Sequence, residues 1–431
     1  MFNERSDNSA LGAQHGLYYG WVIVAASCVV LAMQAGILYS FGVFFKPLVA
    51  DFGWSRGATA GVYSAFMVSH GVFAIPAGWL ADRFGPSKVM VACAILTAAG
   101  LMLTSQVSAL WQIYLTYGFI LGLGLSGPFV IGTSSATRWF AKRRGLALGI
   151  VTAGIGLGTL IVPPLSGRLI TAYDWSRAYL VLGIAALVVM SGCALLLKHP
   201  PKEAEQEKST TASQPKKPVP GQRIVVTSPA EPGISIRVAL GTRVLWTLVL
   251  IYFLFSFCLQ MVMIHLVNYA TDMGISVLVA ATFMSLIGLG STVGRVAMGT
   301  AADRVGSRNA LLICCSLLAL TLAWLLIADQ LWMLYLFSIV FGFAYGGEVP
   351  QMAALVGYFF GLRAVAALVG AVVLGATFGG ALGAWTAGWI FDTAHSYDIA
   401  YAISVGVSVV AVAVTMLLRK QRSIVSGVEA L

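Results

Sequence analysis

The chain has 431 residues, of which 59% are hydrophobic and 10% are charged; its net charge is +10 and its mean hydropathy is +0.88. Soluble globular chains carry about 25% charged and 45–50% apolar residues, so this composition excludes a soluble enzyme, a soluble nucleic-acid-binding protein and a disordered chain. Glycine is abundant, with 47 residues, as in membrane helices whose backbones pack closely. The composition therefore predicts a polytopic membrane protein.

Twelve stretches are long and apolar enough to cross a membrane, since a spanning helix needs about 20 mostly apolar residues. The first, from about Leu17, is too long for the hydrophobic region of a signal peptide and lacks a small-residue cleavage site, so we expect it to be retained. The sequence thus predicts an all-α protein with twelve transmembrane helices in two six-helix halves. The expected spans are residues 18–47, 57–81, 87–105, 109–139, 145–168 and 175–197, followed by 243–270, 276–302, 309–328, 332–358, 364–390 and 397–418.

A hydrophilic segment separates the sixth span from the seventh. Residues 199–234 are rich in Pro, Lys, Glu, Ser and Thr, which is typical of a disordered linker, and residues 235–243 are expected to form a short surface helix. We therefore divide the chain into an N-terminal six-helix half (1–198), a cytoplasmic linker with a short helix (199–242) and a C-terminal six-helix half (243–431).

The basic residues indicate the orientation of the helices. If the N-terminus is cytoplasmic, 21 of the 26 Lys and Arg residues lie on the cytoplasmic side, four lie on the outer side, and one, Arg295, lies within the membrane. Cytoplasmic loops carry an excess of Lys and Arg, so we predict that both termini are cytoplasmic. The positive net charge then reports topology rather than binding to nucleic acid.

The two halves contain an internal repeat. Residues 78–88 read GWLADRFGPSK and residues 299–309 read GTAADRVGSRN, so the motif GxxxDRxG recurs at an offset of 221. A second match joins WFAKRRGLA (139–147) to YFFGLRAVA (358–366) at an offset of 219. Two similar halves joined by a cytoplasmic linker form a parallel repeat, which indicates alternating access around a site near the middle of the membrane.

The repeated motif resembles the signature loop of the major facilitator superfamily, and the resemblance covers essentially the whole chain. Within that superfamily, residues 138–154 (RWFAKRRGLALGIVTAG) resemble the YFxKRRxLAxGxAxAG signature of the monocarboxylate porters. The segments YYGW (18–21), YSFGVFFKPL (39–48) and FGWSR (52–56) resemble the bacterial branch of that family and the related oxalate/formate exchangers. The resemblance implies a major facilitator fold and a transporter of small organic anions in the bacterial inner membrane.

The charged residues of the repeated motifs are expected at the cytoplasmic ends of helices. An aspartate there can interact with helix N-termini and with an arginine of a neighbouring helix, and the resemblance implies that such contacts close the cytoplasmic side and break as the halves rock. The alternative is that these residues only anchor the topology beside tight turns at Gly85 and Gly306. The candidate gate residues are Asp82, Arg83, Arg144, Asp303, Arg304 and Arg363.

Arg295 is predicted to lie roughly 12 Å inside the cytoplasmic end of the eighth helix, eight residues before Asp303. The equivalent residue in the repeat is Ala74, so the arginine is not part of the shared scaffold. Intramembrane charges mark functional sites, and the planar guanidinium suits a carboxylate. Monocarboxylate porters carry an essential arginine on this helix, and GRVAMG (294–299) resembles that position. The resemblance implies that Arg295 binds the substrate carboxylate; an internal ion pair is the alternative.

Three further ionisable residues are predicted within the membrane and are candidates for proton coupling. Glu348, in the tenth helix, could pair with Arg295 when substrate is absent, take up a proton because it is desolvated, or only balance the arginine charge. His70, in the second helix, and His265, in the seventh, titrate near neutral pH. For both histidines the alternative is a neutral ring that is hydrogen-bonded to a neighbour.

Polar residues at similar depth complete the predicted substrate site. Tyr39 and Tyr345 are the preferred candidates for hydrogen bonds to a second polar group of a small acid, although aromatic residues in membrane helices more often pack in the core or anchor the interface. His265, Asn268 and Tyr269 lie within two turns of one another and could form an outer vestibule. The predicted substrate-binding residues are Arg295, Tyr39, Tyr345, Tyr117, Gln260 and Asn268.

Departures from the family pattern bear on coupling and on the substrate. Animal porters carry an acidic residue one turn before the helix-eight arginine, where this chain has Ser291, and a lysine in the first helix, where it has GILYSFG (36–42). The lysine/aspartate/arginine relay is therefore incomplete, and Glu348 or a histidine must substitute, or the acid enters protonated. Oxalate exchangers need a second cation on the eleventh helix, but residues 364–390 contain no Lys or Arg, which favours a monocarboxylate.

We therefore predict a secondary active transporter of small monocarboxylates such as lactate or pyruvate, working by alternating access with protons as the coupling ion. We expect no enzymatic activity, because the sequence shows no catalytic constellation, phosphate-binding loop or metal-ligand spacing. The alternatives are an exchanger or exporter of a larger organic anion and a transporter-like sensor that does not transport. The expected partners are the organic anion, protons and the lipid bilayer, with no cofactor, nucleic acid or obligate protein partner.

Overall fold

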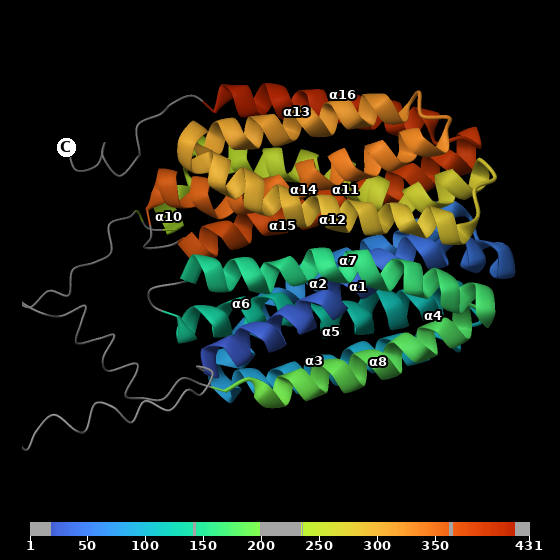
Figure 1. The fold of residues 1–431 in the computed structure, drawn as a ribbon, viewed down its shortest axis with the longest axis horizontal. Helices are drawn as coiled ribbons and strands as arrows, with labels where there is room; N and C mark the ends of the chain where they lie inside the picture. Colours follow the sequence, from blue (N-terminus) through green and yellow to red (C-terminus); the bar gives the residue numbers. More distant parts are fainter. Residues whose placement is uncertain (1–18, 141–143, 199–233, 235, 362–364, 419–431) are drawn as a thin grey trace, which may run out of the picture.

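The computed structural model describes residues 19–140, 144–198, 234, 236–361 and 365–418. Within this part of the chain, twelve helical segments are long and apolar enough to cross a membrane. Six belong to the N-terminal half and six to the C-terminal half, and the two bundles lie side by side, coloured blue to green and yellow to red in Figure 1. The predicted all-α architecture of twelve transmembrane helices is confirmed.

The helices of the N-terminal half begin and end close to the predicted spans. The first continues past its predicted end at residue 47 and ends at Phe52. The fourth span contains a stretch of π-helix, η1. The elements are α1 (Tyr19–Phe52), α2 (Arg56–Phe84), α3 (Pro86–Thr104), the fourth span α4 (Leu110–Ile113), η1 (Tyr114–Leu121), α5 (Gly122–Ser126) and α6 (Pro128–Trp139), then α7 (Arg144–Ala172) and α8 (Trp175–Leu196).

The helices of the C-terminal half follow a short helix, α10, which lies in the stretch where a surface helix was expected. Serine and threonine side chains cap the first helices by accepting backbone N–H groups, as Thr242 does for α11 and Ser276 for α12. The elements are α10 (Ile236–Leu240), α11 (Arg243–Asp272), α12 (Val277–Val305), α13 (Ser307–Leu325), α14 (Leu331–Phe360), α15 (Val365–Ala394) and α16 (Asp398–Leu417).

The repeated motif forms the same tight turn in each half. Gly85 joins α2 to α3 with φ 96°, and Gly306 joins α12 to α13 with φ 84°. L-amino acids with a side chain rarely adopt these values, so each turn requires its glycine. The N–H groups of Gly85 and Gly306 close the preceding helices by donating to the carbonyls of Ala81 and Ala302.

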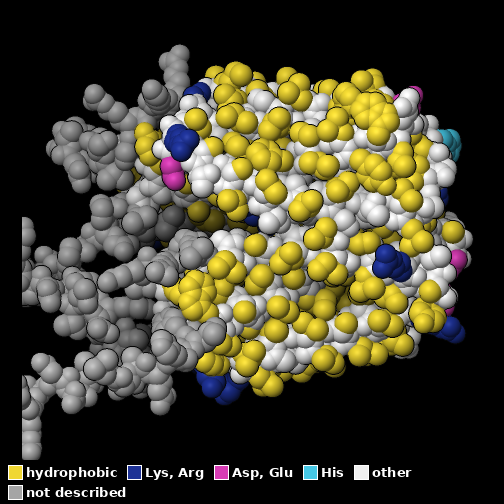
Figure 2. Space-filling view, in the orientation of Figure 1, with side chains coloured by type: hydrophobic (Ala, Val, Ile, Leu, Met, Phe, Trp, Pro, Cys, Tyr) yellow, Lys and Arg dark blue, Asp and Glu magenta, His cyan; other side chains and the backbone are white. Residues whose placement is uncertain are grey.

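The halves meet along a long interface in which α2 packs against α15, α7 against α12, and α1 against α11. We call the end of the bundle where α1 begins and α16 ends the terminal side, at the left in Figure 1, and the opposite end the far side. Hydrophobic side chains cover the surface along the helices, and a hollow lies between the halves toward the terminal side (Figure 2). In membrane transporters built from two such halves, the substrate site lies at the interface between the halves.

Candidate functional site

Arg295 lies at the interface between the halves and reaches from one half to the other. Its side chain is buried, with 9% of the residue exposed, and its Nη1 donates a 2.8 Å hydrogen bond to the carbonyl oxygen of Thr152 in α7. The backbones of α7 and α12 can approach because of two glycines: a Cβ on Gly288 would lie 2.7 Å from the carbonyl oxygen of Gly156. The close approach explains why a residue of α12 can bond to the main chain of α7.

One edge of the Arg295 guanidinium is unoccupied by protein groups. The Nε and Nη2 atoms are buried and have no hydrogen-bond partner among the described residues. These two nitrogens donate side by side in one plane, the geometry that matches the two oxygens of a carboxylate. Leaving such donors buried and unpaired costs about 1–3 kcal/mol each, so this edge favours an anionic partner.

Two tyrosine–polar pairs cross the interface beside Arg295. The hydroxyls of Tyr39 in α1 and Tyr345 in α14 lie 2.8 Å apart, and the hydroxyl of Tyr63 in α2 donates to Oε1 of Gln260 in α11 at 3.2 Å. The ring of Tyr345 also lies 5.7 Å from the guanidinium carbon of Arg295, within cation–π range. We call these five residues, Arg295, Tyr39, Tyr345, Tyr63 and Gln260, the central polar cluster.

Glu348 lies three residues after Tyr345 in α14 and is buried, with 6% of the residue exposed. It is close enough to Arg295 to interact electrostatically. However, the ion pairs within 4.0 Å among the described residues do not include one between these two side chains. The hydroxyl of Tyr252 in α11 donates to the main-chain oxygen of Glu348 at 3.4 Å. Glu348 therefore lies beside the cluster, within the C-terminal half.

The two intramembrane histidines have different surroundings. His70 is half-buried, and its Nε2 lies 3.2 Å from Nε2 of Gln34, an amide that also donates to the carbonyl of Leu125 at 2.7 Å. His265 is fully buried, with Nε2 at 2.9 Å from the carbonyl of Ala384 and Nδ1 at 3.1 Å from the hydroxyl of Tyr397. Because a carbonyl only accepts, Nε2 of His265 carries a proton, and both nitrogens are satisfied by protein groups.

Tyr117 and Asn268, which were predicted to contact substrate, lie in more enclosed places. Tyr117 is fully buried in the N-terminal half, with its ring against those of Phe41 and Phe66. Asn268 is fully buried in α11, where its Nδ2 donates to the carbonyl of Ile264 in the preceding turn. These positions favour packing over substrate contact for both residues.

The predicted gate residues that the structure describes lie at the terminal side. Asp82 forms an ion pair with Arg138, an arginine of α6 in the same half. Asp303 is exposed, and among the described residues it has no basic partner within 4.0 Å. Arg363 and the side chain of Arg144 lie outside the described residues.

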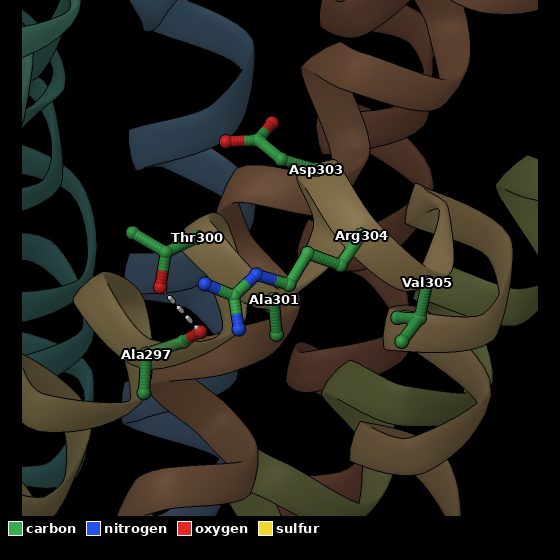
Figure 3. Close-up of a pocket in the computed structure, with 6 residues that line it drawn as sticks. All are labelled: Ala297, Thr300, Ala301, Asp303, Arg304 and Val305. Carbon is green, nitrogen blue, oxygen red and sulfur yellow. Dashed lines mark hydrogen bonds between the residues drawn. The ribbon is translucent and has the colours of Figure 1, made fainter.

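Figure 3 shows the terminal end of α12, where a pocket of about 450 Å³ contains two of the predicted gate residues. The side chains of Asp303 and Arg304 point in different directions there (Figure 3). The residues that line the pocket all belong to the last turns of α12, and no residue of the central polar cluster is among them. This pocket is therefore separate from the central polar cluster.

Comparison with known sequences identifies the family. The chain matches the Major Facilitator Superfamily over residues 23–328 and 289–429. It belongs to the major facilitator superfamily. It is 28% identical over 389 residues to monocarboxylate transporter 13 of Bos taurus, covering 90% of this chain and 86% of that protein. It is 29% identical over 391 residues to monocarboxylate transporter 3 of Rattus norvegicus, covering 90% and 77%.

Solved structures support the same fold for this major facilitator protein. A bacterial homologue of the human lysosomal transporter Spinster, in an inward-facing and unoccupied conformation, superposes with a TM-score of 0.73 at 14% identity, covering 93% of this chain and 97% of that one. The nucleoside transporter NupG superposes with a TM-score of 0.72 at 15% identity, covering 93% and 100%. The predicted resemblance to the superfamily and to its monocarboxylate transporter-like branch is confirmed, and the proteins similar to this chain are membrane transporters.

Four charged residues on the far side of this transporter were not singled out from the sequence. Lys46 and Arg56 in the N-terminal half contact Asp272 in the C-terminal half, and Asp392 of α15 contacts the first residues of α2. A sequence signal exists: in the C-terminal half the far-side ends of the helices carry aspartates, whereas Lys46 and Arg56 lie at the far-side ends of α1 and α2. Such complementary charges indicate an electrostatic contact between halves.

Metal ligation is a separate question. Among the residues that the structure describes, no three His, Cys, Asp or Glu side chains are grouped so that they could hold a metal ion. The central polar cluster supplies instead a guanidinium, hydroxyls and an amide, which bind organic anions through hydrogen bonds.

Proposed function

We propose that this protein is a secondary active transporter of a small monocarboxylate, and that Arg295 binds the carboxylate. The observation that carries the proposal is the Nε and Nη2 edge of a buried arginine at the interface between the halves, which has no partner among the described residues. The similarity to proteins named monocarboxylate transporters supports the same substrate class. The described part of the cluster contains one basic residue, and one cation balances one carboxylate.

The neighbours of Arg295 suit a small, hydroxylated or carbonyl-containing acid. The paired hydroxyls of Tyr39 and Tyr345 lie next to the guanidinium and can each donate or accept a hydrogen bond. A substrate that inserts between them replaces one protein–protein bond with two protein–substrate bonds. A lactate-like or pyruvate-like acid would thus be held by Arg295 through its carboxylate and by a tyrosine through its second oxygen.

Transport follows from the position of these residues in both halves. Arg295 and Tyr345 belong to the C-terminal half, whereas Thr152 and Tyr39 belong to the N-terminal half. If the halves rock about the bound substrate, the cluster is exposed first to one side of the membrane and then to the other. We propose that the terminal side faces the cytoplasm of a bacterial cell, because it carries the excess of Lys and Arg.

Glu348 is the residue that we propose for proton coupling. It is buried beside Arg295 without a direct ion pair, so its charge state and the occupancy of the arginine influence each other through the low-dielectric interior. A substrate carboxylate on Arg295 neutralises the arginine and makes a second negative charge nearby unfavourable, which favours protonation of Glu348. His265 is less suited to this role, because both of its ring nitrogens already have protein partners.

Uptake into proteoliposomes tests the proposal. The purified protein should accumulate radiolabelled lactate or pyruvate, and an inward proton gradient should increase the rate. Arg295→Lys keeps the charge but removes the planar edge, so it should lower uptake by about tenfold to a hundredfold, the loss expected when one or two charged hydrogen bonds are removed. Arg177→Lys is the matched control, since this exposed arginine pairs only with Asp174 of the same half.

Wild-type uptake by the Arg295→Lys variant would show that the free edge does not bind the carboxylate. A thermal-shift panel of monocarboxylic, dicarboxylic and bulkier organic acids distinguishes the substrate classes, because a ligand that binds the folded state raises its apparent stability. Stabilisation by the bulkier acids alone would favour an exporter or exchanger of larger anions. Stabilisation without any uptake would favour a sensor.

A further inference from the structure

The far side of the interface is closed by an aspartate of the C-terminal half. Asp272, at the end of α11, accepts a 2.8 Å hydrogen bond from Nζ of Lys46 in α1. It also accepts two bonds from Arg56 in α2, at 2.6 Å from Nη1 and 3.0 Å from Nη2. The Arg56 contact is bidentate, which is the stronger and more directional form of such a pair. All three bonds join one half to the other.

A second aspartate of the C-terminal half caps a helix of the N-terminal half. Asp392, near the end of α15, accepts the backbone N–H groups of Arg56 and Gly57, each at 2.7 Å. Ser55 caps the same helix within its own half by accepting from Ala58 at 3.1 Å. Carboxylates are favourable at helix N-termini because they satisfy free N–H groups and face the positive end of the helix dipole. The first turn of α2 is thus completed by the other half.

The fit around this contact is tight. A Cβ on Gly57 would lie 2.8 Å from Oδ2 of Asp392, and a Cβ on Gly388 in α15 would lie 2.5 Å from the carbonyl oxygen of Arg56. Arg56 also donates to the hydroxyl of Tyr397 at 2.8 Å, and its guanidinium carbon lies 3.6 Å from the ring centre of Phe391. With 13% of its side chain exposed, Arg56 is better shielded from solvent than Lys46 (39%) or Asp272 (29%).

The terminal side has no equivalent contact within the described residues. Of the hydrogen bonds that these residues make between halves, none lies nearer the terminal ends of its helices than the bond from Arg295 to Thr152. The ion pair of Asp82 with Arg138 joins two helices of one half. Among the described residues, the ion pairs that cross the interface are therefore concentrated at the far side.

We propose that Arg56, Lys46, Asp272 and Asp392 form a far-side lock that holds the transporter closed on that side and must break for substrate to enter or leave there. Its charges become hydrated when the halves separate, so opening exchanges protein partners for water and is reversible. The lock also forces α2 to exchange its cap in each cycle, because Asp392 leaves the first turn of α2 when α15 moves away. The proposal goes beyond the carboxylate site and holds for any substrate.

Distance measurements between spin labels test the lock without using a substrate. A full-length variant with its six cysteines replaced carries labels at Gln106→Cys and Thr393→Cys, which lie exposed at the far side of different halves, and is studied in lipid nanodiscs. Asp272→Asn and Asp392→Asn should each raise the ratio of the long-distance to the short-distance population by about tenfold, since each removes charged hydrogen bonds between halves. Asp272→Glu should restore the short distance.

Asp174→Asn is the matched control, because Asp174 forms a far-side ion pair with Arg177 within one half and caps α8 there. It should leave the distances unchanged. Unchanged distances in both Asp272→Asn and Asp392→Asn, in protein whose melting temperature stays at the wild-type value, would overturn the lock. Since no substrate is present, a failure of the lock and a failure of the carboxylate site remain distinguishable.

Discussion

The N-terminal and C-terminal halves pack their inner helices in the same way. In the N-terminal half a Cβ on Gly158 of α7 would collide with the carbonyl oxygen of Ala32 in α1. In the C-terminal half a Cβ on Gly383 of α15 would collide with the carbonyl oxygen of Phe257 in α11. In both helices another glycine four residues earlier makes the same kind of contact, the spacing that lets membrane helices pack closely.

The halves differ in the charges that they bring into the membrane. Arg295 and Glu348 both belong to the C-terminal half, and the equivalent of Arg295 in the N-terminal half is Ala74. The N-terminal half contributes uncharged polar groups, such as Tyr39 and the Gln34–His70 pair. Both halves therefore provide the same helical scaffold, whereas the charged residues proposed to bind substrate and protons belong to the C-terminal half alone. Three experiments test this difference between the halves.

The largest effect is expected from the acidic residue of the C-terminal half. Glu348→Gln should abolish the stimulation of uptake by an inward proton gradient, because the amide cannot take up the proton, while counterflow of the carboxylate continues. The variant should also be less stable than the wild type, since Arg295 loses the electrostatic attraction of a buried acidic neighbour. Uptake measured with and without the gradient, together with thermal unfolding, checks both effects.

The control for that experiment lies in the N-terminal half. His70→Gln replaces an uncharged polar group with another beside Gln34, and gradient stimulation should remain at the wild-type level. If His70→Gln removed the stimulation and Glu348→Gln did not, the proposed division between the halves would be wrong.

An intermediate effect is expected from the shared scaffold. Gly158→Ala and Gly383→Ala should each destabilise the protein by about 1–3 kcal/mol, because the added methyl group forces two helix backbones apart. Gly370→Ala, in the same helix as Gly383, is the control, since a Cβ there meets nothing within 4 Å. Thermal unfolding in detergent measures all three. A large loss in one half alone would contradict the symmetry of the packing.

The smallest effect is expected from the hydroxyl pair that joins the halves. Tyr39→Phe and Tyr345→Phe should each raise KM by about two- to tenfold, the effect of losing one hydrogen bond of roughly 0.5–1.5 kcal/mol. Because the two hydroxyls share one bond, the double variant should be little worse than either single variant. Additive losses in a double-mutant cycle would show that each tyrosine contacts the substrate independently.

Much of the architecture could be predicted from the sequence because lipid imposes strong constraints. Spans such as 57–81 and 175–197 were located to within a few residues of α2 and α8, since only long apolar helices satisfy their backbone in a bilayer. The turns at Gly85 and Gly306 were predicted, and both have positive φ. Once the basic residues expected at loops and helix ends are set aside, Arg295 is the basic residue that remains. The structure places it at the interface between the halves.

Partners across the interface could not be predicted in the same way. Asp82 was expected to meet an arginine of a neighbouring helix, but which one depends on how α2 packs, and the structure pairs it with Arg138. His265 was a proton-coupling candidate, yet Ala384 and Tyr397 of distant segments occupy both of its nitrogens. The far-side contact of Arg56 with Asp272 joins residues 216 positions apart, and local periodicity contains no information on such pairs.

The sequence alone predicts twelve membrane-crossing helices, one scaffold that is repeated twice and a single arginine, Arg295, away from the loops and helix ends. These properties follow from the free-energy cost of placing charges and unpaired backbone groups in lipid. Because this cost depends on each residue and its neighbours in sequence, it can be read without knowing the fold. Two features could be recognised only in the folded chain: the Nε and Nη2 edge of Arg295 has no partner among the described residues, and Asp392 caps a helix of the other half. Both facts depend on directional contacts between surfaces that are remote in sequence.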